Sequence, residues 1–211
     1  MKAAAIQLNS KLDLAKTDKT YYTAPNHPQI VTLPKLTYLA VTDKGSPDSP
    51  IFARTTEALY KLAYSVKAIC KADGCDFTVP KLEGLWWVES EQKALEVPRE
   101  EWHWKLFIQL PDFAQSDQIE DARRQAIAKN KGMDTLQHVT FEAMEEGMSV
   151  QMMHVGPYST ELETINQIHA FMETKKLVQS GLHHEIYLSD PRKVDPAVLK
   201  TILRLPVREL K

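Results

Sequence analysis

Cysteine is scarce in this 211-residue chain, which contains only Cys70 and Cys75, at a spacing that does not form a Cys-x-x-Cys pair. Two thiols cannot build a thiolate zinc site or a framework of several disulfides. We therefore expect both cysteines to be reduced and to have structural roles.

Glycine is also scarce, and its seven residues form neither a phosphate-binding loop nor a Gly-x-Ser-x-Gly motif. Their arrangement excludes P-loop nucleotide hydrolysis and the nucleophile elbow of α/β-hydrolases. A His-Glu-x-x-His motif is missing too, and the adjacent His183 and His184 would point to opposite faces of a strand. The sequence therefore predicts no metal site and no cofactor.

Long apolar runs are missing, since no run approaches the roughly 20 residues that span a bilayer. Gln7 and Asn9 interrupt the start of the chain too early for a secretion signal, so we expect a cytoplasmic protein. The formal net charge is −2 and no segment is rich in arginine, unlike a typical nucleic-acid-binding protein. We expect neither a membrane nor a nucleic acid as a partner, and the sequence identifies no protein partner.

The chain contains two pairs of matching segments. Residues 105–111 and 200–206 each begin with lysine, continue with alternating apolar residues and end with proline. Upstream, residues 82–87 and 184–188 each place a glutamate beside aromatic residues. Each half also begins with an apolar strand, a turn and an amphipathic helix, so we infer a duplicated strand-helix-strand-strand unit with a groove between the copies.

This duplication gives the expected organisation of the chain. We expect an N-terminal arm over residues 1–33, a first repeat over about 34–112, a connecting helix over about 116–132 and a second repeat over about 146–211. The patterns predict strands at 36–41, 76–79, 82–89, 102–110, 148–155, 183–188 and 200–206. They also predict one helix at 50–71, capped by Ser49, and another that begins with a capping box of Thr160 and Glu163.

The predicted strand over 183–188 carries the main candidate for chemistry. Alternation places Glu185 and Tyr187 on one face, and Ile186 and Leu188 on the other, which we expect to face the helices. Glu185 would then lie on an open face, where a carboxylate can bind a cation or activate water. The alternative is that Glu185 is a salt-bridged carboxylate of the sheet.

All four tryptophans lie between residues 86 and 104: Trp86, Trp87, Trp102 and Trp104. Such a cluster suits either a core or a flat aromatic ligand held by stacking. Because successive strand residues face opposite ways, Trp86 and Trp87 cannot both line one groove.

Weaker candidates are Tyr38, Tyr158 and His154. The tyrosines would form a binding set only if they converged on one groove. His154 ends a strand before Gly156 and is expected to be a hydrogen-bonded structural residue, although it also begins the segment 154–159, His-Val-Gly-Pro-Tyr-Ser.

Several motifs together resemble the stand-alone form of the GyrI-like small-molecule-binding family. They are residues 38–48, 82–87, Trp104, 154–159 and 183–192, of which the last, His-His-Glu-Ile-Tyr-Leu-Ser-Asp-Pro-Arg, is the most specific. The resemblance covers about residues 30–207. It implies an α+β fold of two tandem strand-helix-strand-strand (SHS2-type) repeats with pseudo two-fold symmetry and a central ligand groove, as in GyrI-like and SOUL-like proteins.

The resemblance also implies a function and roles for residues. In related multidrug-sensing regulators the matching glutamate, here Glu185, faces cationic aromatic drugs. The stand-alone branch implies a metal-independent hydrolase that opens the cyclopropane ring of DNA-alkylating cyclopropanoid compounds. Glu185 would act as general base and Tyr187 as its orienting or proton-donating neighbour. The candidate ligand-binding residues are Glu83, Trp86, Trp87, Trp104, Tyr38, Tyr158 and His154.

Two other functions use the same resemblance. In one, the protein binds or sequesters flat aromatic or cationic drugs in the same groove without turnover. In the other, it interacts with gyrase, a function that only the name of the family suggests. For the hydrolase and for the drug-binding protein, the partner is a small aromatic or cationic organic ligand.

Overall fold

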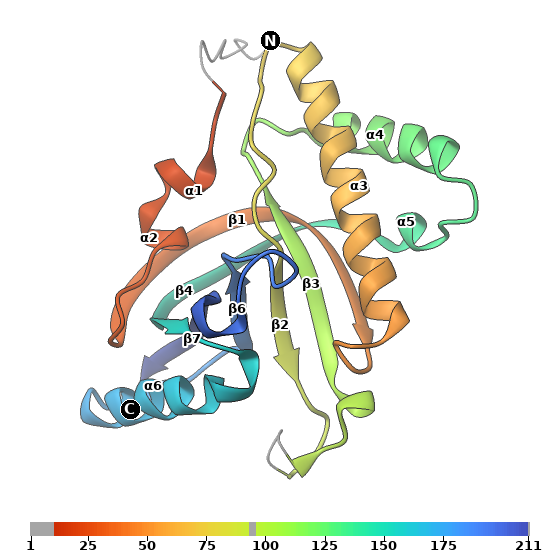
Figure 1. Ribbon diagram of the computed structural model, residues 1–211. Coiled ribbons are helices and arrows are strands. Elements are labelled where there is room, and N and C mark those ends of the chain that lie inside the picture. The colour runs from red at the N-terminus through yellow and green to blue at the C-terminus, as the bar shows by residue number, and fades with distance from the viewer. Residues whose placement is uncertain (1–10, 93–95, 211) are drawn as a thin grey trace.

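The computed structural model describes residues 11–92 and 96–210, and Figure 1 shows helices arranged around a strongly curved sheet. The helices are α1 (Leu14–Thr17), α2 (Lys19–Tyr22), α3 (Pro50–Ala72), α4 (Ser116–Lys129), α5 (Thr135–His138) and α6 (Glu161–Thr174). Short 3-10 helices are η2 (Arg99–Glu101), η3 (Tyr158–Thr160) and η4 (Pro196–Val198). The strands are β1 (Gln29–Lys44), β2 (Glu83–Trp87), β3 (His103–Leu110), β4 (Thr140–Val155), β5 (Leu177–Gln179), β6 (His183–Tyr187) and β7 (Lys200–Glu209).

The antiparallel sheet closes on itself. The strand order is β4-β1-β3-β2-β6-β7-β5, and β4 also pairs with β7, so six of the strands form a barrel-like ring. This confirms the mixed α and β composition that the sequence predicted, whereas closure of the sheet was not predicted. Within the described residues, no helix is long and apolar enough to cross a membrane.

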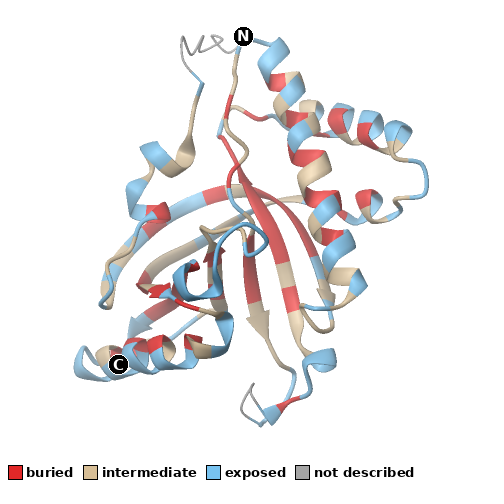
Figure 2. Cartoon of the chain, in the orientation of Figure 1, coloured by how far each residue is buried: buried red, intermediate tan, exposed pale blue. Residues whose placement is uncertain are grey.

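Helix α3 covers one side of the ring, as expected from its sequence. The Ser49 hydroxyl accepts a hydrogen bond from the Phe52 N–H at 3.3 Å, and Pro50 occupies the first turn, where its missing N–H costs nothing. The buried stripe of α3, which includes Leu59, Leu62 and Val66, packs on β1 and β3 and against α4. Figure 2 shows this buried stripe facing the sheet and exposed residues on the opposite side of the helix.

Helix α6 covers a second side of the ring. Its residues Ile168 and Met172 pack with Val150 of β4 and Leu203 of β7. The predicted capping box is wrong, because the Thr160 side chain does not cap the helix. Its hydroxyl instead donates to the Pro157 carbonyl at 2.8 Å within η3, the turn that precedes α6.

Strands β1 and β4 are longer than predicted. The first half of β4, residues 140–147, pairs with β1 from Ala40 to Leu33, although its polar composition gave no strand signal. β1 begins inside the segment predicted as an arm. In contrast, residues 76–79 form no strand, and Phe77 makes a single bridge with Leu12.

The described part of the predicted arm, residues 11–28, holds α1 and α2 and packs onto the ring. Tyr21 and Tyr22 are 0% and 2% exposed, and they pack with Ile186 and Ile202 on the face of the sheet turned away from α3 and α6. The first ten residues of the predicted arm lie outside the described part of the chain. The sheet is thus covered by α3 and α6 on one face and by this segment on the other.

Candidate functional site

Glu185 lies on the face of the sheet that carries α3 and α6. A row of directly paired residues crosses this face in the order Val41, Leu106, Gly84, Glu185, Leu203 and Met152. The residues at the ends of the row belong to the cores under α3 and α6. Glu185 and Gly84 therefore lie midway between the two helices, where Figure 1 shows β2 and β6.

This arrangement corrects one prediction. Glu185 and Tyr187 do share a face, as the alternation predicted, but Ile186 was expected to face the helices and does not. Ile186 packs beside Tyr21 and Tyr22 on the opposite face, because the arm fills that side of the sheet. The strands β2 and β6 lie between the two helices, so their helix-facing side is where polar and aromatic side chains gather.

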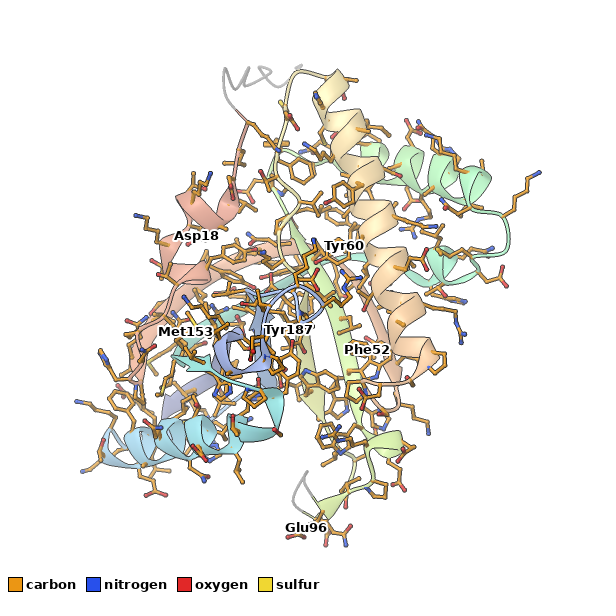
Figure 3. All side chains as sticks on the ribbon, in the orientation of Figure 1. Asp18, Phe52, Tyr60, Glu96, Met153 and Tyr187 are labelled. Carbon is orange, nitrogen blue, oxygen red and sulfur yellow. The ribbon has the colours of Figure 1, made fainter. Side chains whose placement is uncertain are left out.

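Aromatic side chains from four elements converge beside Glu185, and we call Phe52, Trp86, Trp102, Tyr158 and Tyr187 the aromatic cluster. Trp86 Nε1 donates to the Tyr187 hydroxyl at 2.9 Å. The Phe52 ring stacks on Trp86 with centroids 5.8 Å apart, while Trp102 meets the edge of Trp86 at 6.1 Å and Tyr158 meets Tyr187 at 6.0 Å. All five side chains keep some exposure, so the cluster is accessible from solvent. Figure 3 shows Phe52 and Tyr187 facing the space between α3 and β6.

Gly84 makes room for the cluster. A Cβ atom at this position would lie 3.0 Å from both Trp86 Nε1 and the Tyr187 hydroxyl, which is closer than normal packing allows. The absence of a side chain at Gly84 therefore lets these two groups hydrogen-bond directly over the backbone of β2.

The Glu185 carboxylate is held by its neighbours on β6. Its Oε1 lies 3.2 Å from His183 Nε2, and the Tyr187 hydroxyl hydrogen-bonds to it. Burial, together with the charges of Glu185 and Glu161, raises the pKa of Tyr187 well above its ordinary value. Tyr187 therefore stays protonated and can act as a donor at neutral pH.

Glu161, the first residue of α6, was not predicted as a site residue. It is 8% exposed, and burial followed by the charge of Glu185 raises the pKa of its carboxyl group. Phe52 and Trp102 were missed as well. Nothing in the sequence places the start of α6 next to β6, because these elements meet only through the tertiary fold.

Three of the predicted ligand-binding residues are not part of the accessible cluster. Trp104 pairs with Trp86 and its ring meets Phe52 edge-on at 5.4 Å, but it is fully buried in the core under α3, where its Nε1 donates to the Gly45 carbonyl at 3.1 Å. Trp87 stacks on His103 and lies on the opposite face of β2 from Trp86, so Trp86 is the tryptophan that points toward the cluster. His154 is 4% exposed; its Nε2–H donates to the Pro157 carbonyl at 3.2 Å, and Nδ1 accepts from Thr164 at 2.9 Å. This bonding agrees with the structural role that was expected of His154.

Glu83 and Tyr38 were also predicted to line the ligand groove, but they do not lie on the face of the sheet that carries Glu185. Glu83 pairs with Ile186 and so faces away from Glu185, in the interior of the ring. It is fully buried and accepts hydrogen bonds from Tyr21, from Tyr22 at 3.3 Å and from His184 Nε2 at 3.0 Å. The Tyr38 hydroxyl lies 3.1 Å from that of Tyr21 in the same interior.

These interior groups belong to a larger cluster, which we call the buried ion network: Glu83, Glu146, His184 and Arg204. His184 Nδ1 lies 2.9 Å from Glu146, and Arg204 NH1 lies 2.8 Å from the same carboxylate. Although burial opposes it, the two neighbouring carboxyl groups raise the pKa of His184, which favours its protonated form between them. The network links the ring to the arm, because Arg204 NH2 also donates to the Tyr21 carbonyl at 2.7 Å.

The described residues offer no better site elsewhere. No group of three or more His, Cys, Asp or Glu side chains in residues 11–92 and 96–210 is arranged to hold a metal ion. A surface recess of about 720 Å³ lies between α3 and the α4–α5 connection, lined by charged and small residues such as Arg54, Lys61 and Lys129. It has no aromatic side chain in its lining and is remote from Glu185, so the aromatic cluster is the better candidate site.

Comparisons with known proteins place this geometry in a family. Residues 26–208 match the family described as a GyrI-like small molecule binding domain. An uncharacterized conserved protein from Listeria innocua is 40% identical, with a TM-score of 0.88, over 94% of this chain and 100% of that one. A second structure from Listeria innocua, described as a hydrolase, is 39% identical with a TM-score of 0.84 over the same shares.

More distant structures agree on the fold. The EcmrR C-terminal domain is 12% identical, with a TM-score of 0.57, over 87% of this chain and 98% of that domain. Similarity at this level shows the fold alone. No curated protein matches the chain. The family match covers most of the sequence, and the chain therefore belongs to the GyrI-like small-molecule-binding domain family.

Proposed function

We propose that this protein is a hydrolase that binds a flat, reactive cyclopropanoid molecule against the aromatic cluster and opens its cyclopropane ring with water. The observation that carries the proposal is the Glu185 carboxylate, which is held by His183 and Tyr187 amid accessible aromatic rings. The similar Listeria innocua protein that is described as a hydrolase supports a hydrolytic activity.

The chemistry requires a positioned water molecule and an electrophile whose carbonyl is polarised. Glu185 would act as general base toward the water, and Tyr187 would fix the orientation of the carboxylate through its hydrogen bond. Trp86, whose own N–H is engaged by Tyr187, would offer its ring face to the ligand, with Tyr158 at the other side. Of the tryptophans first considered, Trp86 remains as a wall, while Trp87 lies on the opposite face of β2 and Trp104 is fully buried against Phe52.

A second candidate function is binding without turnover. The Glu185 carboxylate lies beside rings whose faces attract cations, and this combination suits a flat cationic drug. The two functions share one site, and they differ in whether the ligand is recovered intact.

We also infer that the two halves of the chain arose by duplication. The order β1-α3-β2-β3 in the first half is repeated as β4-α6-β6-β7 in the second, with the short β5 inserted. Superposition of the halves about a pseudo two-fold axis between β2 and β6 is the corresponding prediction.

The test compares wild type, Glu185→Gln and the control Glu173→Gln, which changes an exposed glutamate on α6. Each is incubated with a cyclopropanoid alkylator in ¹⁸O-labelled water, and ring opening is followed by mass spectrometry. We expect labelled ring-opened product from wild type and the control. The rate of ring opening by Glu185→Gln should be lower by about 10²-fold or more. Saturable binding with intact ligand recovered from wild type would instead favour sequestration.

A further inference from the structure

Glu161 has an unusual environment for a carboxyl group. It lies at the first position of α6, it is 8% exposed, and its Oε1 atom is buried without a hydrogen-bond partner. Among the buried side-chain oxygens of the described residues, Thr56 Oγ1 is the other that lacks a partner. Burying an unpaired polar atom costs about 1–3 kcal/mol, and far more if the group is charged. Such a cost is more readily understood at a site that acts on a ligand.

The surroundings of Glu161 favour its neutral form. A helix N-terminus by itself favours a carboxylate, but burial and the charge of Glu185 outweigh it and raise the pKa of Glu161. The pKa of Tyr158 also depends on this carboxyl group: burial and then Glu161 raise the pKa of Tyr158 to about 12. The titratable groups that interact with Glu161 are Glu185 and Tyr187 on β6 and Tyr158 on η3. His183 contacts Glu185, and Asp190 after β6 acts on Tyr158.

We propose that Glu161 is a second catalytic group of the site: a neutral carboxyl that donates a proton to the ligand oxygen while Glu185 accepts one from water. The proposal rests on the proposed hydrolase function and adds the acid that this function lacks. Two carboxyl groups with environments that separate their protonation states are the usual basis for such paired acid and base roles.

The proton balance of this step closes without a co-reactant. Glu185 takes a proton from water as the water oxygen forms a bond to a cyclopropane carbon. The carbon–carbon bond breaks, and its electron pair moves through the conjugated ring to the carbonyl oxygen. Glu161 protonates that oxygen, which becomes a phenol, and the proton held by Glu185 then returns to Glu161 directly or through solvent.

Tyr187 is a poorer choice for the acid. Its hydroxyl accepts from Trp86 Nε1 at 2.9 Å and is bonded to Glu185, so its proton is already engaged with the base. The Oε1 atom of Glu161, by contrast, is buried without a hydrogen-bond partner, so no protein group competes with a ligand for it. This difference assigns the orienting role to Tyr187 and the donor role to Glu161.

The experiment uses Glu161→Gln with Glu163→Gln as matched control, because both replace a glutamate side chain in the first turn of α6 and Glu163 is exposed. Steady-state ring opening gives kcat and KM for wild type and both variants. Infrared spectra near neutral pH detect the stretch of a protonated carboxyl group, which should be present in wild type and lost in Glu161→Gln. We expect kcat to fall about 10²-fold or more in Glu161→Gln with KM within about three-fold.

Each outcome is decisive. If wild type turns over and Glu161→Gln keeps its kcat, or if no protonated carboxyl band disappears in that variant, the role of Glu161 is refuted while the hydrolase function stands. If wild type itself opens no ring, the hydrolase function fails and the donor role fails with it. An equal loss in Glu163→Gln would assign the effect to the helix terminus and also contradict the proposal.

Discussion

Removal of one charge from the buried ion network should strongly destabilise the fold, and Arg204→Met tests this. Arg204 and Glu146 have side chains that are 0% and 4% exposed, so neither charge can turn to solvent when its partner is lost. Loss of the guanidinium would leave the Glu146 carboxylate short of a partner, together with the Gln151 oxygen and the Tyr21 carbonyl. Breaking a buried ion pair in this way costs about 3–5 kcal/mol.

This loss is a large part of a total stability of about 5–15 kcal/mol. With a urea dependence of about 2–3 kcal/mol per molar, the unfolding midpoint should fall by roughly 1–2.5 M. Urea unfolding followed by tryptophan fluorescence measures the midpoint. Limited proteolysis should also cut residues 11–28 faster, because Arg204 holds the Tyr21 carbonyl.

Two controls separate the network from a general effect of the substitution. Arg208→Met, at an exposed position on the same strand, should leave the midpoint almost unchanged. Arg204→Lys keeps the charge, but its compact ammonium group cannot reach all three acceptors that the planar guanidinium group contacts, so an intermediate loss is expected. A midpoint for Arg204→Met within about 0.3 M of wild type would refute the reasoning, since it would mean that the buried pair contributes little.

Three further predictions concern other parts of the molecule. Gly84→Ala should push Trp86 away from Tyr187 and weaken ligand binding several-fold by fluorescence titration; unchanged affinity would separate that contact from binding. The network lowers the pKa of Glu146 to about 2 from 4.5, so roughly 3 kcal/mol of stability, present above pH 4.5, should be lost as pH falls toward 2. Thermal unfolding between pH 6 and 3 measures this loss, and Glu146→Gln should show a flatter dependence. Ser49→Ala should cost about 1 kcal/mol through the cap of α3 in urea unfolding, and a neutral effect would contradict the cap.

Local patterns in the sequence were informative where local physics decides the structure. Ser49 and Pro50 located the start of α3, and the alternation over 183–188 correctly grouped Glu185 with Tyr187. These features depend on hydrogen bonds and side-chain directions within a few residues.

Features that depend on distant segments were not predictable. The pairing of β4 with both β1 and β7 closes the ring, and nothing in the polar segment 140–147 indicates it. The partners of Glu83 lie in Tyr21 and Tyr22, more than sixty positions earlier, so its burial could not be read from its own strand. Because the arm packs inside the ring, the face of β6 that carries Ile186, which was expected to meet the helices, meets Tyr21 and Tyr22 instead.

Closure of the ring has a consequence for how the site meets its ligand. Phe52 and Tyr158 approach Trp86 and Tyr187 from α3 and η3, which are carried by opposite arcs of one continuous hydrogen-bonded band. Separating those arcs would break the backbone pairing of β1 with β4 and of β2 with β6, so the site cannot open like a hinged jaw. The site can then adapt to different molecules only by rotation of exposed rings such as Tyr158. We therefore expect the protein to select ligands by their thickness more than by their length.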